Sequence, residues 1–119
     1  MAEYRNERAG RLIQEKIGAL IVEGRIKDPR VDSFLSITRV DVSRDLAYAD
    51  VYVSSYKTGA GLAKGVEGLQ SAAGFIHSQL NAQIRLRQIP RLRFHEDRGV
   101  KEGFDLVKKI EDLVNHDGA

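Results

Sequence analysis

The strongest constraint on the fold is a strict two-residue alternation in residues 47–53. Small apolar side chains alternate with tyrosines and an aspartate, in the string Ala47-Tyr48-Ala49-Asp50-Val51-Tyr52-Val53. Successive side chains of a β-strand point to opposite faces of its sheet, so this strand has one apolar and one polar face. The segment therefore predicts a sheet that is covered on one face only, by helices that pack closely against the small side chains.

The remaining elements follow from apolar periodicity. Apolar residues at helical spacing predict three helical segments, and further alternation predicts two more strands. A three-residue connection at residues 43–45 makes the first two strands antiparallel. In chain order we predict helix, strand, strand, helical stretch, strand and helix, over residues 4–23, 34–42, 46–54, 60–88, 91–97 and 103–115.

The helical stretch over residues 60–88 contains four glycines, Gly61, Gly65, Gly68 and Gly74. Each interior glycine costs about 1 kcal/mol relative to alanine, so the segment is expected to bend. Gly74 lies near its middle and is the best candidate for the kink. The segment then ends before Pro90, which cannot continue a helix.

Length and composition favour one globular domain over residues 1–119. The chain is 42% apolar and 30% charged, it has no cysteine, and its longest apolar run is Ala19-Leu20-Ile21-Val22. That run is far short of the roughly 20 residues of a membrane-spanning helix. The charged residues 1–11 carry no signal-peptide core. We expect a cytoplasmic, monomeric protein without a disulfide framework.

No pattern in the sequence predicts catalysis. The three histidines, His77, His95 and His116, lack metal-ligand spacing. No nucleophile elbow, phosphate loop or dinucleotide fingerprint is present. We therefore expect a binding protein that is not an enzyme and needs neither metal nor cofactor.

The distribution of charge is more informative than its net value of +2. Residues 68–95 contain no acidic residue, while the other 91 residues hold 15 Lys or Arg against 17 Asp or Glu. The acid-free stretch holds four arginines and two histidines, namely His77, Arg85, Arg87, Arg91, Arg93 and His95. A local basic patch on a nearly neutral body is expected for phosphate binding. The alternative is a face that only improves solubility.

An ordered series of short strings resembles the ribosome-binding factor A family. They are Ile26-Lys27-Asp28-Pro29-Arg30, Val42-Ser43-Arg44-Asp45-Leu46-Ala47-Tyr48-Ala49, Val51-Tyr52-Val53, Leu69-Gln70-Ser71-Ala72-Ala73-Gly74-Phe75-Ile76, Arg85-Leu86-Arg87, Ile89-Pro90, Leu92-Arg93-Phe94 and Asp97. The resemblance implies an α+β fold of the K-homology type II kind, with a small three-stranded sheet covered on one face in the order α-β-β-α-kink-α-β-α. It also implies a helix–kink–helix at Ala72-Ala73-Gly74, in place of the usual GXXG loop.

The same resemblance implies a function. Members bind the immature small (30S) ribosomal subunit, contact its RNA and aid late 16S rRNA maturation, notably in the cold. The alternative is a protein-interaction module that docks to a ribosomal protein or an assembly GTPase without touching RNA.

The candidate RNA-binding residues are small or basic and lie mostly in the acid-free stretch. They are Arg44, Ala72, Gly74, His77, Arg85, Arg87, Arg91 and Arg93. The small residues at the kink have a second explanation, which is close packing of the helix against the sheet.

The arginines fall into two pairs. On a helix, Arg85 and Arg87 point about 200° apart, so one is expected to contact RNA and the other to hold the fold. On a strand, Arg91 and Arg93 share a face, which suits binding along an RNA backbone. The alternative for this second pair is a solvated open face of the sheet.

Three further features have alternative interpretations. Tyr48 and Tyr52 share a strand face with Asp50, and either stack on bases or, more commonly, form cross-strand pairs. The string Gly65-Val66-Glu67-Gly68 matches GXXG but lies within a predicted helix and would bring a carboxylate toward phosphate. In the connection after the first strand, Asp45 is expected to bond its own backbone.

Overall fold

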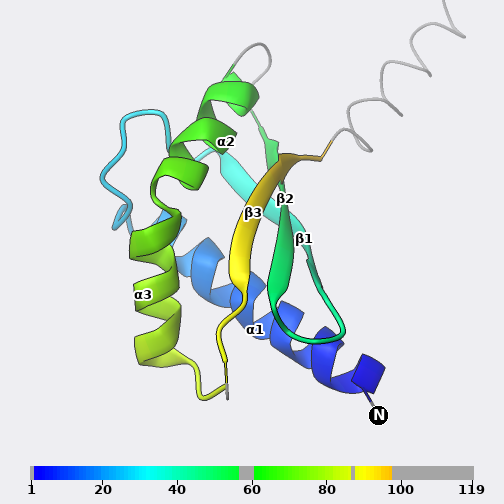
Figure 1. The fold of residues 1–119 in the computed structure, drawn as a ribbon. Helices are drawn as coiled ribbons and strands as arrows, with labels where there is room; N and C mark the ends of the chain where they lie inside the picture. Colours follow the sequence, from blue (N-terminus) through cyan, green and yellow to red (C-terminus); the bar gives the residue numbers. More distant parts are fainter. Residues whose placement is uncertain (1, 57–60, 87, 98–119) are drawn as a thin grey trace, which may run out of the picture.

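The computed structural model describes residues 2–56, 61–86 and 88–97 (Figure 1). Their elements are helix α1 (Ala2–Val22), strand β1 (Leu35–Val42), strand β2 (Tyr48–Ser55), helix α2 (Gly61–Ser71), helix α3 (Ala73–Gln83) and strand β3 (Arg91–Glu96). The predicted α+β class and element order are confirmed for this part of the chain. The helix predicted over residues 103–115 lies outside the described residues, and a single domain over residues 1–119 stays a prediction.

The three strands form one sheet in the order β1-β2-β3. As predicted, β1 and β2 are antiparallel, with Val40 opposite Val51. Strand β3 pairs with β2 in parallel, with Leu92 opposite Ala49 and Phe94 opposite Val51. A parallel neighbour requires a crossover connection, and α2 and α3 provide it.

The one-sided burial predicted from β2 is confirmed. Ala49, Val51 and Val53 are fully buried, whereas Tyr48 and Tyr52 lie on the opposite face. Helix α1 contacts β1, α2 contacts β2 and β3, and α3 contacts β3, all on the same side of the sheet (Figure 1). The other face of the sheet, which we call the open face, is covered by none of the helices among the described residues.

A β-bulge explains why the alternation of β1 is harder to read. The register shifts between Ile37 and Arg39, so the residue at 38 is extra and the inward-facing parity changes there. Leu35 and Ile37 are buried before the bulge, and Val40 packs against the core after it. The bulge thereby places Arg39 on the open face.

The predicted bend exists and lies within the Ala72-Ala73-Gly74 string, although Gly74 is not the residue at which the helix breaks. The helical stretch breaks at Ala72, two residues before Gly74, which lies in the first turn of α3. The N–H of Ala72 bonds to the carbonyls of both Gly68 and Leu69, a tightening typical of a helix end.

The end of the stretch was also predicted too late. Helix α3 stops at Gln83, and Ile84 is extended with its side chain buried in the core. Packing of Ile84 thus ends the helix before Pro90 does. Arg85 consequently lies beyond α3, and Arg87 lies outside the described residues.

Two glycines of α2 pack tightly, one against strand β1 and the other against the loop before it. A Cβ at Gly65 would lie 2.7 Å from a methyl carbon of Leu35, and one at Gly68 would lie 2.9 Å from Val31. These glycines permit close packing of α2, which is consistent with setting the Gly65-to-Gly68 string aside as a nucleic-acid loop.

None of the helices among the described residues is long and apolar enough to cross a membrane.

We predict opposite effects for two alanine substitutions in α1. A Cβ at Gly10 would lie 2.7 Å from the backbone oxygen of Val40, whereas a Cβ at Gly18 would meet no atom within 4 Å. Gly10→Ala should lower the free energy of unfolding by about 1–3 kcal/mol, because backbone is displaced. Gly18→Ala should raise it by up to about 1 kcal/mol. Urea denaturation of both variants measures this, and equal stabilities would contradict the packing of α1 on β1.

Candidate nucleic-acid interface

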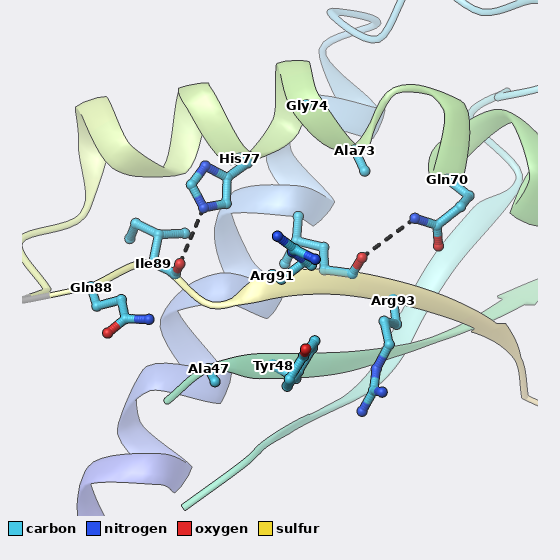
Figure 2. A pocket seen from close by; sticks show the side chains of 11 residues that line it. Ala47, Tyr48, Gln70, Ala73, Gly74, His77, Gln88, Ile89, Arg91 and Arg93 are labelled. Carbon is cyan, nitrogen blue, oxygen red and sulfur yellow. Dashed lines mark hydrogen bonds between the residues drawn. The ribbon is translucent and has the colours of Figure 1, made fainter. Parts of the chain in front are cut away.

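A groove of about 700 Å³ runs between the helix break and strand β3; we call it the α3–β3 groove. Figure 2 shows side chains from the helices on one side and from the strands on the other. The helices contribute Gln70, Ala73, Gly74 and His77, and the strands and the segments just before β2 and β3 contribute Ala47, Tyr48, Gln88, Ile89, Arg91, Leu92 and Arg93. Four of the eight predicted site residues, Gly74, His77, Arg91 and Arg93, therefore line one groove.

The other predicted residues lie elsewhere. Ala72 lines a smaller hollow of about 270 Å³ on another side of the break, with Lys27 and Phe75. Arg44 is exposed in the β1–β2 connection, and Arg85 is exposed after α3. Neither arginine lines the groove. The helical geometry predicted for Arg85 and Arg87 was wrong for Arg85, because α3 ends first.

Gly74 is open to the groove. A Cβ at this position would meet no atom within 4 Å, so packing does not require a glycine here, and the packing explanation is wrong for Gly74. Ala72, in contrast, is partly buried against the core, as that explanation expected.

The N-terminus of α3 is not capped by a side chain. Its N-cap residue is Ala72, which makes no side-chain hydrogen bond, and the first turn has no acidic residue. The first N–H groups of a helix have no partner within the helix and carry partial positive charge. Anions bind readily at such a terminus.

His77 fixes the width of the groove. Its Nε2–H donates a hydrogen bond to the carbonyl oxygen of Ile89 at 3.1 Å (Figure 2). The proton is on Nε2 because a carbonyl only accepts. His77 thus ties α3 to the segment that leads into β3, and its role in the described contacts is to position that segment.

Gln70 holds the other end of the groove, and sequence reasoning missed it. Its amide nitrogen donates to the carbonyl of Leu92 at 3.4 Å, and its amide oxygen accepts from the N–H of Phe94 at 2.9 Å. Gln70 therefore bonds to the free edge of β3 as a neighbouring strand would. Nothing in the sequence distinguishes this glutamine from one that faces solvent.

Arg91 and Arg93 share the exposed face of β3, as predicted, but they differ in their contacts. Arg93 pairs with Asp50, with Nε at 2.9 Å from Oδ1, and its guanidinium lies 4.6 Å from the centre of the Tyr48 ring. Within the described part of the chain, Arg91 has no ion pair. Arg91 is therefore the cation of the groove that is available to a phosphate.

Asp50 of β2 pairs with two residues of β3, Arg93 and His95. It accepts a hydrogen bond from His95 at 2.8 Å. Partial burial raises the pKa of Asp50. The hydrogen bonds from His95 and Arg93 lower this pKa by more than burial raises it, so the pKa of Asp50 is below its ordinary value. Asp50 stays ionised and keeps Arg93 in place.

The loop before β1 braces the helix break. Asp28 accepts hydrogen bonds from the side chain and backbone of Arg30, which lower the pKa of Asp28 to about 2. Arg30 in turn donates to Ser71 at 3.1 Å, and Arg25 donates to Gln79 of α3 at 3.0 Å. The loop thereby contacts both helices around the break.

The described residues include no group of His, Cys, Asp or Glu that could hold a metal ion.

Comparison with known proteins assigns the family. A family model described as ribosome-binding factor A matches residues 5–111. The chain belongs to the ribosome-binding factor A family. It is 52% identical over 113 residues to ribosome-binding factor A of Treponema denticola, covering 95% of this chain and 86% of that protein.

Solved structures of the family share the fold. The solution structure of a Thermotoga maritima ribosome-binding factor A protein has a TM-score of 0.60 and 35% identity, covering 76% of this chain and 88% of that one. A homology model of Thermus thermophilus ribosome-binding factor A, fitted into a cryo-EM map of a complex between the 30S subunit and ribosome-binding factor A, has a TM-score of 0.53 and 24% identity, covering 73% of this chain and 93% of that one. The predicted K-homology-like fold is confirmed.

We predict that Asp28 makes the stability of this protein sensitive to acid. Its folded-state pKa of about 2 lies below the ordinary value of 3.8. The unfolded chain therefore binds more protons between these values, so the contribution of Asp28 is present above the ordinary pKa and is lost as the pH falls toward 2. Between about pH 5 and pH 2, Asp28→Asn should lose less stability than the wild type.

Urea unfolding at several pH values measures that difference. Glu23→Gln, which removes an exposed carboxyl that contacts neither Arg30 nor the break, is the matched control. An equal acid-induced loss in Asp28→Asn and the wild type would show that this brace does not stabilise the fold.

Proposed function

We propose that this protein binds the immature small (30S) ribosomal subunit by holding its RNA in the α3–β3 groove, and that it aids late 16S rRNA maturation. The observation that carries the proposal is the convergence of Gly74, the N-terminus of α3 and Arg91 on one groove. It acts by binding, without catalysing a reaction, and it works as a cytoplasmic monomer.

The chemistry of the groove suits an RNA backbone. Arg91 supplies a positive charge from the strand side, and the uncapped N–H groups of α3 supply partial positive charge from the helix side. Gly74 leaves space for a sugar or phosphate to approach the helix backbone. Recognition of this kind reads shape and charge.

Membership of this family supports the small ribosomal subunit as the binding target. The printed name of the family is a ribosome-binding factor, and a Thermus thermophilus member was fitted into a map of its complex with the 30S subunit. Binding of this protein to the immature subunit would keep that subunit from engaging later partners early. Growth in the cold is the condition under which we expect its loss to matter most.

Arg44, Ala72 and Arg85, which do not line the groove, remain predicted RNA-binding residues, as does Arg87, which lies outside the described residues. Arg44 and Arg85 are exposed and suited to phosphates that flank the bound segment. Ala72 would act indirectly, by allowing the break between α2 and α3.

A bulky side chain at position 74 tests the proposal. Gly74→Leu should keep the fold, since leucine favours a helix and a Cβ there meets open space, but it should fill the groove. In a sucrose gradient of cell extract, tagged wild-type protein should travel with free small subunits and not with joined ribosomes. Gly74→Leu should remain largely at the top.

Gly18→Leu is the matched control, because Gly18 is also an open helical glycine but lies in α1; it should sediment like the wild type. Co-sedimentation of Gly74→Leu with small subunits would exclude the groove as the site. Wild-type protein at the top of the gradient, in low salt as well, would overturn the ribosomal assignment and favour the protein-interaction module.

A further inference from the structure

The open face of the sheet carries the same three-residue arrangement twice. In each copy a carboxylate bonds a guanidinium and a tyrosine ring lies against that guanidinium. In the first, Arg39 Nε is 3.0 Å from Asp41 Oδ2, and the guanidinium carbon is 4.2 Å from the centre of the Tyr52 ring. In the second, Arg93 pairs with Asp50 at 2.9 Å and lies 4.6 Å from the Tyr48 ring.

This arrangement holds two arginines in fixed orientations at the surface. An arginine side chain loses much rotamer freedom when it is immobilised, and here contacts with a carboxylate and a tyrosine have already restricted it. The carboxylate occupies hydrogen-bonding positions of the guanidinium, and the guanidinium carbon lies over the tyrosine ring. Both arginines are still half exposed or more, at 60% for Arg39 and 51% for Arg93.

A planar, half-exposed guanidinium is a stacking platform for a flat ligand. Nucleic-acid bases stack on arginine planes as they do on aromatic rings, and such stacking tolerates any base. The two arginine–carboxylate pairs are each neutral overall, so they present no net negative charge to RNA. The cross-strand pairing expected for Tyr48 and Tyr52 is observed, with Arg93 and Arg39 as their respective partners.

The second arrangement is continuous with the groove. Tyr48 and Arg93 line the α3–β3 groove and also stand on the open face (Figure 2). The first arrangement lies further across the sheet, where Tyr52 is opposite Arg39 on one side and His95 on the other. A strand of RNA that leaves the groove past Arg93 would pass onto this face.

We propose that the open face of the sheet is a second RNA-binding surface, on which unpaired bases stack against the guanidinium groups of Arg93 and Arg39. The inference rests on the proposed function of the groove and extends it from backbone binding to base stacking. It assigns Arg39, Tyr52 and Asp41, none of which lines the groove, to RNA binding.

The test uses a fluorescently labelled oligoadenylate and an abasic strand of the same length. Arg39→Lys keeps the charge but removes the planar group, so it should weaken oligoadenylate binding by about fivefold or more. It should leave the salt dependence and the weaker binding of the abasic strand unchanged. Arg8→Lys, an exposed arginine of α1, is the matched control and should bind like the wild type.

Arg91→Gln separates this proposal from that of the groove. If Arg91→Gln weakens binding of both strands and Arg39→Lys changes neither, the groove stands and base stacking on the sheet is overturned. If Arg39→Lys weakens binding to isolated small subunits but not to oligoadenylate, the open face contacts a ribosomal protein, and the RNA proposal is likewise overturned.

Tyrosine emission gives a second readout, because the chain has four tyrosines and no tryptophan. Oligoadenylate should quench the emission of the wild type, and Tyr52→Leu should lose part of that quenching. Equal quenching in the two proteins would contradict stacking of bases on Arg39, whose guanidinium lies over the Tyr52 ring.

Discussion

The burial of one face of β2 is the constraint on which the rest of the structure depends. Ala49, Val51 and Val53 are fully buried under the helices. Since these side chains are small, the helices lie close to the sheet, and glycines occur where α1 and α2 meet β1 most tightly. The three helices of the described residues share this face and leave the other face of the sheet uncovered by any of them, and the α3–β3 groove lies at the free edge of β3.

Much of this fold could be predicted from the sequence, because apolar periodicity reports burial directly. Periodicity alone did not locate the bulge in β1, the break at Ala72 or the end of α3, although the family resemblance placed a kink at Ala72-Ala73-Gly74. Each depends on a tertiary contact: Arg39 must reach the open face, the loop at Asp28 and Arg30 must brace α2, and Ile84 must reach the core. Local propensity contains no information about such partners.

In the candidate site, too, some residues could be predicted from the sequence and others could not. The distribution of charge along the chain located the basic stretch, and the position of Gly74 in the helical stretch singled out that residue. Strand spacing placed Arg91 and Arg93 on one face. Sequence alone could not separate Arg91 from Arg93, because the ion pair with Asp50 joins residues 43 positions apart. It could not find Gln70 either, since an edge-bonding glutamine and a solvated one look alike. Partners distant in the chain decide which polar residues are available to a ligand.

The salt dependence of binding tests most directly whether this groove holds RNA. Affinity for isolated small subunits would be measured over a range of salt concentrations, for the wild type and for Arg91→Gln. If about five phosphates are neutralised, log K against log salt should have a slope of about −4, and Arg91→Gln should reduce its magnitude by about 1. A complex that is insensitive to salt and survives ribonuclease would contradict the account.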